Sequence, residues 1–374
     1  MAISLKPLKN QVLVITGASS GIGLATARAA AKKGARLVLA ARNGEALADI
    51  VQELNMQGGQ AIHVVADVGR REDVQRIADA ALDRFGGFDT WVNNAGISIF
   101  GRLEDVSVED YHRLFDTNFW SVVYGSLIAA SYLRNQGGAI INLGSVLSDA
   151  AIPIQGMYSA SKHAVKGFTD ALRMELEHDG APVSVTLIKP TSINTPYTEH
   201  AANYTGHDVT LPPPVYAPEE VANAILHAAA HPKRDVMVGS SAKVMSSLNK
   251  YAEGAMDWMA ENVMYDQQLR DQTARHSEGS LYRPARDGQV HGDYQGHVMK
   301  TSLYTRATLN PLITGAVVAA AGAATYALLK SNGRKKQEHH EQWQNRASQR
   351  EREQWQNRAR QIERDQLKNG NSHY

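Results

Sequence analysis

The sequence predicts an α/β fold in which a parallel sheet carries helices on both faces, a doubly wound arrangement. Apolar runs of strand length alternate with stretches of helical periodicity, and the runs are rich in Val, Ile and Leu. In addition, the first run leads directly into a glycine-rich turn and a helix. The expected strands are residues 11–16, 36–41, 61–66, 89–93, 138–144, 183–189 and 235–238. The expected helices are residues 21–33, 44–57, 71–85, 107–133, 157–179 and 218–230.

The turn after the first strand, residues 16–23, reads Thr-Gly-Ala-Ser-Ser-Gly-Ile-Gly. Its glycines let the backbone approach a pyrophosphate, and the dipole of the following helix favours the negative charge. The spacing is Gly-x-x-x-Gly-x-Gly. Taken alone, it leaves open a glycine turn that binds no ligand.

The second expected strand ends without an acidic residue and is followed by Arg42. An acid at this position accepts a hydrogen bond from the ribose 2′-hydroxyl of NAD, whereas a guanidinium suits a 2′-phosphate. We therefore expect NADP(H) in preference to NAD(H). A solvated surface arginine is the alternative.

Four polar residues in the middle of the chain, Asn118, Ser145, Tyr158 and Lys162, are the candidate catalytic group. Tyr158 and Lys162 are four residues apart on an expected helix, which places the phenol and the ammonium on one face. A neighbouring ammonium lowers the pKa of a tyrosine from its usual ~10. Together with the glycine turn, an activated tyrosine indicates hydride chemistry on an alcohol or ketone.

These motifs resemble those of the short-chain dehydrogenase/reductase family over about residues 8–240. Besides the turn and the four polar residues, Asn-Asn-Ala-Gly at 93–96 matches the family. Asp67-Val68, at the end of the third strand, resembles the pair that meets the adenine ring. Residues 189–195 resemble its Pro-Gly segment, with Thr191 in place of the glycine, and the resemblance implies Thr195 as a partner for the nicotinamide carboxamide. The resemblance implies a Rossmann fold and a homo-oligomer.

The resemblance also implies a role for each residue. Tyr158 is then the general acid in reduction or the base in oxidation, and Lys162 holds the nicotinamide ribose and lowers the tyrosine pKa. Ser145 positions the substrate oxygen, and Asn118 fixes a water for proton relay. The implied cofactor-binding residues are Gly17, Ser19, Ser20, Gly21, Ile22, Gly23, Arg42, Asp67, Val68, Asn94, Ala95, Gly96, Tyr158, Lys162, Pro190 and Thr195. An inactive descendant that keeps the fold is the alternative.

The chain has 374 residues, more than one such domain needs. We expect the catalytic domain at 1–240, an extension atypical of the family at 241–306, an apolar helix at 307–330 and a charged tail at 331–374. Residues 196–217 resemble the family's variable substrate loop, whose tyrosines favour an apolar substrate or simply pack. The extension carries a methionine-rich stripe that we interpret as core or interface.

Residues 312–329 form an uncharged run of 18 residues, barely long enough to span a bilayer. Much of it is Ala and Gly, so it is either a membrane-associated segment, which we favour, or a packing helix. The tail repeats Glu-Gln-Trp-Gln-Asn-Arg-Ala at 341–347 and 353–359 without an apolar seam, which indicates a disordered or partly helical segment. No N-terminal leader is expected, and we expect a cytoplasmic protein.

Composition excludes several other classes. The chain has no cysteine and a formal net charge of +1, so disulfides and thiolate metal sites are absent and nucleic-acid binding is not expected. The histidines show no metal spacing, and we expect no metal. The main hypothesis is an NADP(H)-dependent oxidoreductase acting on a carbonyl or secondary alcohol, as a reductase. The alternative is a dinucleotide-binding scaffold or sensor that acts through its C-terminal extension.

Overall fold

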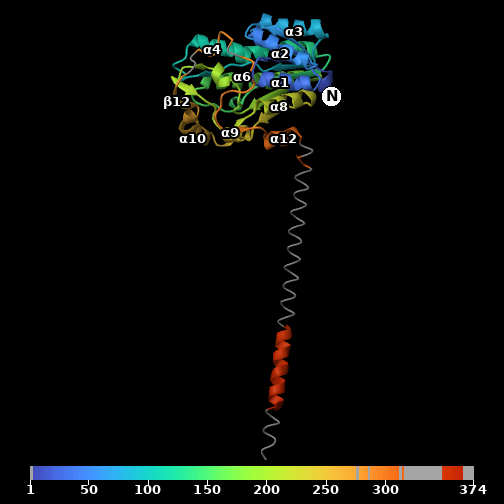
Figure 1. Ribbon diagram of the computed structural model, residues 1–374, viewed down its shortest axis with the longest axis vertical. Helices are drawn as coiled ribbons and strands as arrows, with labels where there is room; N and C mark the ends of the chain where they lie inside the picture. The colour runs from blue at the N-terminus through green and yellow to red at the C-terminus, as the bar shows by residue number, and fades with distance from the viewer. Residues whose placement is uncertain (1–2, 275–277, 285–286, 311–313, 316–347, 365–374) are drawn as a thin grey trace, which may run out of the picture. The chain divides into compact units, whose positions relative to one another are not determined.

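The computed structural model describes residues 3–274, 278–284, 287–310, 314–315 and 348–364. The chain divides into two compact units, residues 1–309 and 310–374. The first unit contains a seven-stranded sheet with helices on both faces, so the predicted doubly wound α/β fold is confirmed (Figure 1).

The sheet is parallel throughout, in the order β11-β7-β6-β4-β1-β2-β3. Its strands are β1 (Val12–Thr16), β2 (Arg36–Ala41), β3 (Gln60–Val65), β4 (Thr90–Asn93), β6 (Gly138–Leu143), β7 (Val183–Pro190) and β11 (Asp235–Val238). Strand order reverses between β1 and β4, because β2 and β3 lie on one side of β1 and β4 lies on the other. In such sheets ligands bind in the crevice at the carboxyl ends of these two strands.

Two apolar cores lie on the two faces of the sheet. One is formed with α1 (Gly21–Lys32), α2 (Gly44–Met56) and α8 (Pro218–Ala230). The other is formed with α3 (Arg71–Phe85), α5 (Ser121–Leu133) and α6 (Gly156–His178). Trp91 on the central strand β4 is fully buried in the second core.

Local sequence explains where these helices start and stop. The side chain of Asn43 accepts a hydrogen bond from the Ala46 amide at 3.1 Å and caps α2. Helix α8 begins with Pro218 followed by two acids, as expected of a helix N-terminus. The single helix expected at 107–133 is interrupted: α4 (Val108–Phe115) continues as a π-helical turn, Asp116–Trp120, and then as α5. Such turns are frequent at functional sites.

The extension belongs to the first unit and packs against the rest of it. It contains α9 (Ser240–Tyr251), α10 (Glu253–Met259), a π-helical turn (Ala260–Met264), α11 (Tyr265–Gln267), β12 (Leu269–Thr273), β13 (Val298–Met299) and α12 (Leu303–Leu309). Strand β12 pairs with β9 (His207–Val209), and β13 pairs with β10 (Val215–Tyr216). Met245, Met256 and Met264 are buried in an apolar cluster with Val146 and Leu147 of the core, so two methionines of the expected stripe, Met245 and Met256, are core residues.

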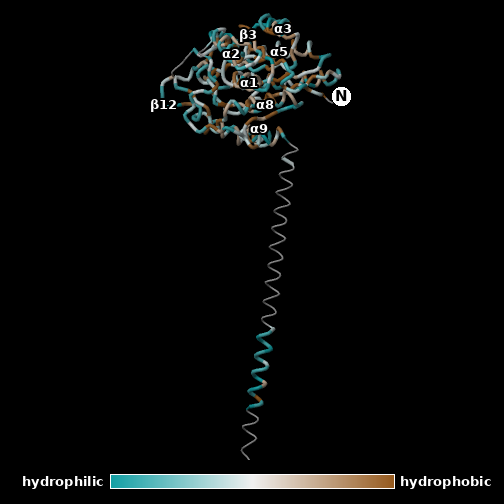
Figure 2. Tube along the Cα trace, turned by 45° about the vertical axis from the view of Figure 1, so that its right-hand side comes forward, coloured by the Kyte–Doolittle hydropathy of each residue, from teal (hydrophilic) through white to brown (hydrophobic). Residues whose placement is uncertain are grey.

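Residues 348–364 of the second unit are helical with every side chain exposed, and the hydropathy colouring of Figure 2 shows this helix as largely hydrophilic. The apolar run 312–329 lies outside the described residues except for Thr314 and Gly315. Within the described part of the chain, no helix has both the length and the apolar character needed to cross a membrane.

Candidate active site

A cavity of about 640 Å³ opens at the carboxyl ends of the central strands. Of the sequence-predicted site residues, all but Gly23 and Asn118 line it. The structure therefore brings together the glycine turn, Arg42, the Asp67-Val68 pair, the Asn-Asn-Ala-Gly segment and the Ser145, Tyr158 and Lys162 side chains. Gly23 and Asn118 lie directly behind the cavity wall, where their contacts, described below, hold them.

Gly23 and Asn94 hold the glycine turn in shape. A Cβ atom on Gly23 would lie 2.1 Å from the Gly17 carbonyl oxygen, so no larger residue fits there. The Asn94 Nδ2 donates to the carbonyl oxygens of Thr16 and Gly17 at 2.8 and 3.1 Å. Gly17 and Gly21 have φ angles of 64° and 52°, the left-handed region that favours glycine.

Tyr158 and Lys162 lie on α6 and face the cavity. Burial raises the pKa of Tyr158 to about 12, while contacts with the Tyr197 and Ser145 hydroxyls act in the opposite direction. Burial also lowers the pKa of Lys162 to about 8. The expected lowering of the tyrosine pKa by Lys162 is therefore wrong for this structure. The Lys162 ammonium lies 5.6 Å from the ring centroid of Tyr158 and donates to the Leu143 carbonyl oxygen at 2.8 Å. Burial of the phenol therefore has a larger effect on the Tyr158 pKa than the ammonium has.

Ser145 and Asn118 are fixed by backbone contacts. Ser145 Oγ accepts from the Leu147 amide at 3.1 Å and caps the short helical turn Val146–Ser148. Asn118 lies in the π-helical turn and is fully buried. Its side chain accepts from the Ile97 amide and donates to the Ile97 carbonyl, both at 2.9 Å. A Cβ on Gly96, which lines the cavity, would lie 3.4 Å from Asn118 Oδ1 and 3.9 Å from Lys162 Nζ.

Tyr197 is a cavity residue that the sequence reasoning assigned only to a variable loop. Its hydroxyl lies 2.8 Å from both Ser98 Oγ and Gln155 Oε1, and its ring meets Tyr158 edge to face at 5.7 Å between centroids. Gln155 in turn donates to Gln268 of the extension at 2.6 Å. Tyr197 comes two residues after Thr195, a predicted cofactor-binding residue. This closeness in sequence is the signal that could have identified Tyr197 as a cavity residue.

Arg42 lies at the end of β2, as expected, but its hydrogen bonds were not foreseen. Its guanidinium donates to the carbonyl oxygens of Ser280 and Leu281 at 2.5 and 3.0 Å. Arg113 donates to the same Leu281 oxygen at 2.8 Å and pairs with Asp67 at 2.7 Å. Burial and the charge of Arg113 lower the pKa of Arg42, while Asp67 and Asp287 act against this.

The extension supplies one wall of the cavity, which the sequence did not indicate. Its helices contribute a largely apolar wall from Val244, Met245, Met259, Val263 and Met264. A later stretch contributes Ser280, Pro284 and Asp287. The cavity therefore has one end near Arg42, where the nucleotide is expected and which we call the nucleotide end, and an apolar end beside Tyr158.

The chain is similar to a family model and to several known proteins. The model of the short chain dehydrogenase family matches residues 11–204. The uncharacterized oxidoreductase YxnA of Bacillus subtilis is 48% identical over 324 residues, covering 85% of this chain and 90% of that protein. A match of that length includes much of the extension. The 11-beta-hydroxysteroid dehydrogenase A of Sesamum indicum is 35% identical over 260 residues, or 67% of this chain and 74% of that protein.

Two solved structures are also similar. A short chain dehydrogenase/reductase from Burkholderia phymatum in complex with NAD has a TM-score of 0.61 and 28% identity, covering 68% of this chain and 97% of that one. An alcohol dehydrogenase from Thermococcus sibiricus complexed with 5-hydroxy-NADP has a TM-score of 0.54 and 30% identity, covering 61% and 95%. Fold and cavity thus define an oxidoreductase of the dinucleotide-binding class. The chain belongs to the short-chain dehydrogenase/reductase family.

Proposed function

We propose that the protein is an NADP(H)-dependent reductase that converts a carbonyl substrate to a secondary alcohol, with Tyr158 as the acid. The observation that carries this proposal is the convergence of Tyr158, Ser145 and Lys162 on a cavity whose other end is the glycine turn. Bound NADPH supplies the hydride for such a reaction, and the protein supplies position and protons.

The protonation states fit the acid role of Tyr158. A Tyr158 pKa of about 12 keeps the phenol protonated at neutral pH, which is the form that donates a proton to a developing alkoxide. Lys162, with a pKa of about 8, is mainly cationic at pH 7 and suits the ribose hydroxyls. Ser145 adds a second hydroxyl at the reacting oxygen, which stabilises the charge that develops there.

The proton lost by Tyr158 needs a route of return. The buried amide of Asn118 and the Lys162 ammonium both lie close to Gly96. Thr117 Oγ1 is buried and has no hydrogen-bond partner among the described residues, and Thr117 lines the cavity. We assign a relay water to this corner, between Thr117, Asn118 and Lys162.

The apolar end of the cavity favours a bulky, apolar substrate. Methionine side chains of the extension line it, and they adapt to irregular shapes. The Sesamum indicum relative is named as a hydroxysteroid dehydrogenase, which supports the same class of ketone. Membrane association through 312–329 and homo-oligomer formation stay predictions.

Arg42 supports NADPH over NADH, because it brings a guanidinium to the end of β2 with N–H groups beyond the two that bind Ser280 and Leu281. Asp287 acts against this preference, since its carboxylate lies in the same cavity.

Fluorescence titration of the full chain with NADPH and with NADH decides which cofactor binds more tightly. We expect Arg42→Ala to weaken NADPH binding by about ten- to a hundredfold and NADH binding by less than about threefold. The matched control is Arg84→Ala, an exposed arginine outside the cavity. Tighter binding of NADH by the unaltered chain would refute the NADPH assignment.

Tyr158→Phe tests the chemistry. We expect the kcat/KM for ketone reduction to fall by about 10²–10⁴-fold while the NADPH dissociation constant is unchanged. Tyr251→Phe is the control, because Tyr251 is 78% exposed.

The scaffold alternative is favoured by the packing of the extension against the cavity. It predicts NADPH binding without turnover of any ketone in the unaltered chain.

A further inference from the structure

Two described stretches of the extension lie along the nucleotide end of the cavity. We call these stretches, residues 278–284 and 287–292, the strap. At one end of the strap the carbonyl oxygens of Ser280 and Leu281 accept hydrogen bonds from Arg42, and Leu281 also accepts one from Arg113. Both arginines lie beside Asp67, the residue expected at the adenine. The strap therefore closes the side of the cavity where the adenosine half of a dinucleotide belongs.

The second stretch binds the backbone of the glycine turn. The Gly288 amide donates to the Ser19 carbonyl and the Gly21 amide donates to the Gln289 carbonyl, both at 2.9 Å. Gly292 packs so closely on Thr195 that a Cβ atom would lie 2.3 Å from the Thr195 carbonyl oxygen. Thr195 is the residue expected at the nicotinamide. The strap thus touches the cavity wall from the adenine end to the nicotinamide end.

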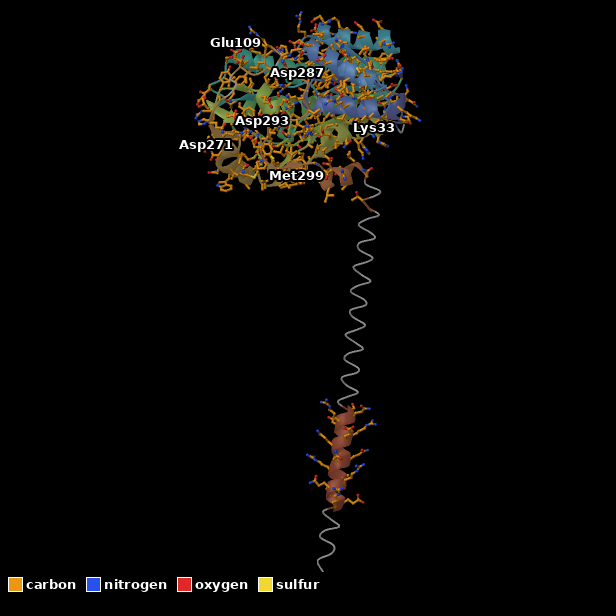
Figure 3. All side chains as sticks on the ribbon, in the orientation of Figure 1. Lys33, Glu109, Asp271, Asp287, Asp293 and Met299 are labelled. Carbon is orange, nitrogen blue, oxygen red and sulfur yellow. The ribbon has the colours of Figure 1, made fainter. Side chains whose placement is uncertain are left out.

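Anchors outside the cofactor-binding residues hold the strap down. The Ser280 amide and hydroxyl both donate to the His200 carbonyl oxygen, at 2.7 and 2.9 Å. Tyr282 donates to Asp110 at 2.7 Å. Gly279, with φ +56°, lies against the backbone of Ala201. Asp287, labelled in Figure 3, is only 9% exposed and faces His200 at 3.9 Å.

We propose that the strap retains a bound dinucleotide, so that cofactor exchange requires the strap to open and is slow compared with exchange from an uncovered crevice. The inference rests on the proposed function, because it takes the cavity to be a dinucleotide site. Opening the strap breaks the backbone bonds to Ser19 and Gly21 together with the arginine bonds to Ser280 and Leu281. Because these contacts are made by one short segment, they are lost as a unit. Release of the product nucleotide then limits steady-state turnover.

The test measures the dissociation rate of NADPH from the full chain by a stopped-flow chase with excess NADP⁺. In Gly279→Ala the new Cβ would lie 2.4 Å from the Ala201 carbonyl carbon, which pushes the strap away without touching a cofactor-binding residue. Gly58→Ala is the matched control, since Gly58 also has a positive φ, +87°, but no atom within 4 Å of the new Cβ. We expect dissociation at least about tenfold faster in Gly279→Ala and unchanged in Gly58→Ala.

Tyr282→Phe provides a second variant should Gly279→Ala fail to fold, because the ring is 61% exposed and only the bond to Asp110 is lost. We expect dissociation about threefold faster. Equal dissociation rates in the unaltered chain and in every strap variant that folds would overturn the retention proposal, while the binding itself would still support the proposed function. Failure of the unaltered chain to bind either NADPH or NADH would overturn both.

Discussion

Asp149 offers a prediction whose magnitude follows from the structure. Its carboxylate is 7% exposed and forms ion pairs with Lys166 and with Lys189, the latter at 2.9 Å. It also accepts from Ser246 of α9 at 2.9 Å, and its backbone oxygen accepts from Asn249 of the same helix at 2.7 Å. Asp149 therefore ties the extension helix that lines the apolar end of the cavity to the core.

Asp149→Asn leaves the Lys189 ammonium, whose side chain is 6% exposed, without its counter-charge. Breaking a buried pair in this way costs about 3–5 kcal/mol of unfolding free energy. Lys166 is 39% exposed, so solvent screening limits its share to about 0–1 kcal/mol. We expect a total loss of about 3–5 kcal/mol at pH 7, measured by urea unfolding followed by circular dichroism.

The acid dependence has a definite sign. Burial alone would raise the pKa of Asp149, but the hydrogen bonds from Lys166 and Lys189 outweigh it and hold the pKa below its usual range. The stabilisation by the carboxylate is therefore complete above about pH 4 and is lost as the pH falls through the lower folded-state pKa. In Asp149→Asn this part of the acid sensitivity should be missing.

Asp179→Asn is the matched control, because Asp179 and its partner Arg134 are 45% and 47% exposed. We expect a loss of about 0–1 kcal/mol there. Adding Lys189→Met to Asp149→Asn should recover a large part of the stability, since the unpaired charge is removed. A loss from Asp149→Asn no larger than that from Asp179→Asn would refute this reasoning.

Three further changes have clear expected outcomes. Gly23→Ala should weaken NADPH binding at least about a hundredfold in a fluorescence titration, because the Cβ clashes with the Gly17 carbonyl oxygen at 2.1 Å and distorts the turn. Lys162→Met should stabilise the cofactor-free protein at pH 7 by at most about 3 kcal/mol, because burial of the ammonium lowers its pKa from 10.5 to about 8, and the lost hydrogen bond to the Leu143 carbonyl oxygen offsets part of the gain. Urea unfolding should show that gain shrinking as the pH rises from 8 towards 10.5. Tyr197→Phe should lower kcat/KM about tenfold with an unchanged NADPH dissociation constant, because a hydroxyl is lost beside the reacting group.

The sheet could be predicted because its strands are uninterrupted apolar runs. The run from Val12 to Thr16 is buried at every position, which is the pattern that parallel central strands produce. The π-helical turn at Asn118 could not be predicted, because the local sequence continues a helical pattern through it. Periodicity gives the class of an element but not this kind of irregularity.

For the cavity residues too, some features could be predicted from the sequence and others could not. Tyr158 and Lys162 could be located from their spacing, whereas the direction of the tyrosine pKa depends on how deeply the hydroxyl is buried. Arg42 could be placed at the end of β2, but its partners are backbone carbonyls more than two hundred positions away. Backbone acceptors carry no side-chain signature, so the strap left no pattern in the sequence.

The strap and the methionine-lined wall have a consequence for how the properties of this protein can be changed. Both lie beyond residues 11–204, the part that the family model matches. If the proposals above hold, we expect changes in the extension to alter substrate choice and cofactor exchange without altering Ser145, Tyr158 and Lys162. A chimera that grafts the extension of a homologue such as YxnA onto this core would exchange those two properties together and keep the chemistry.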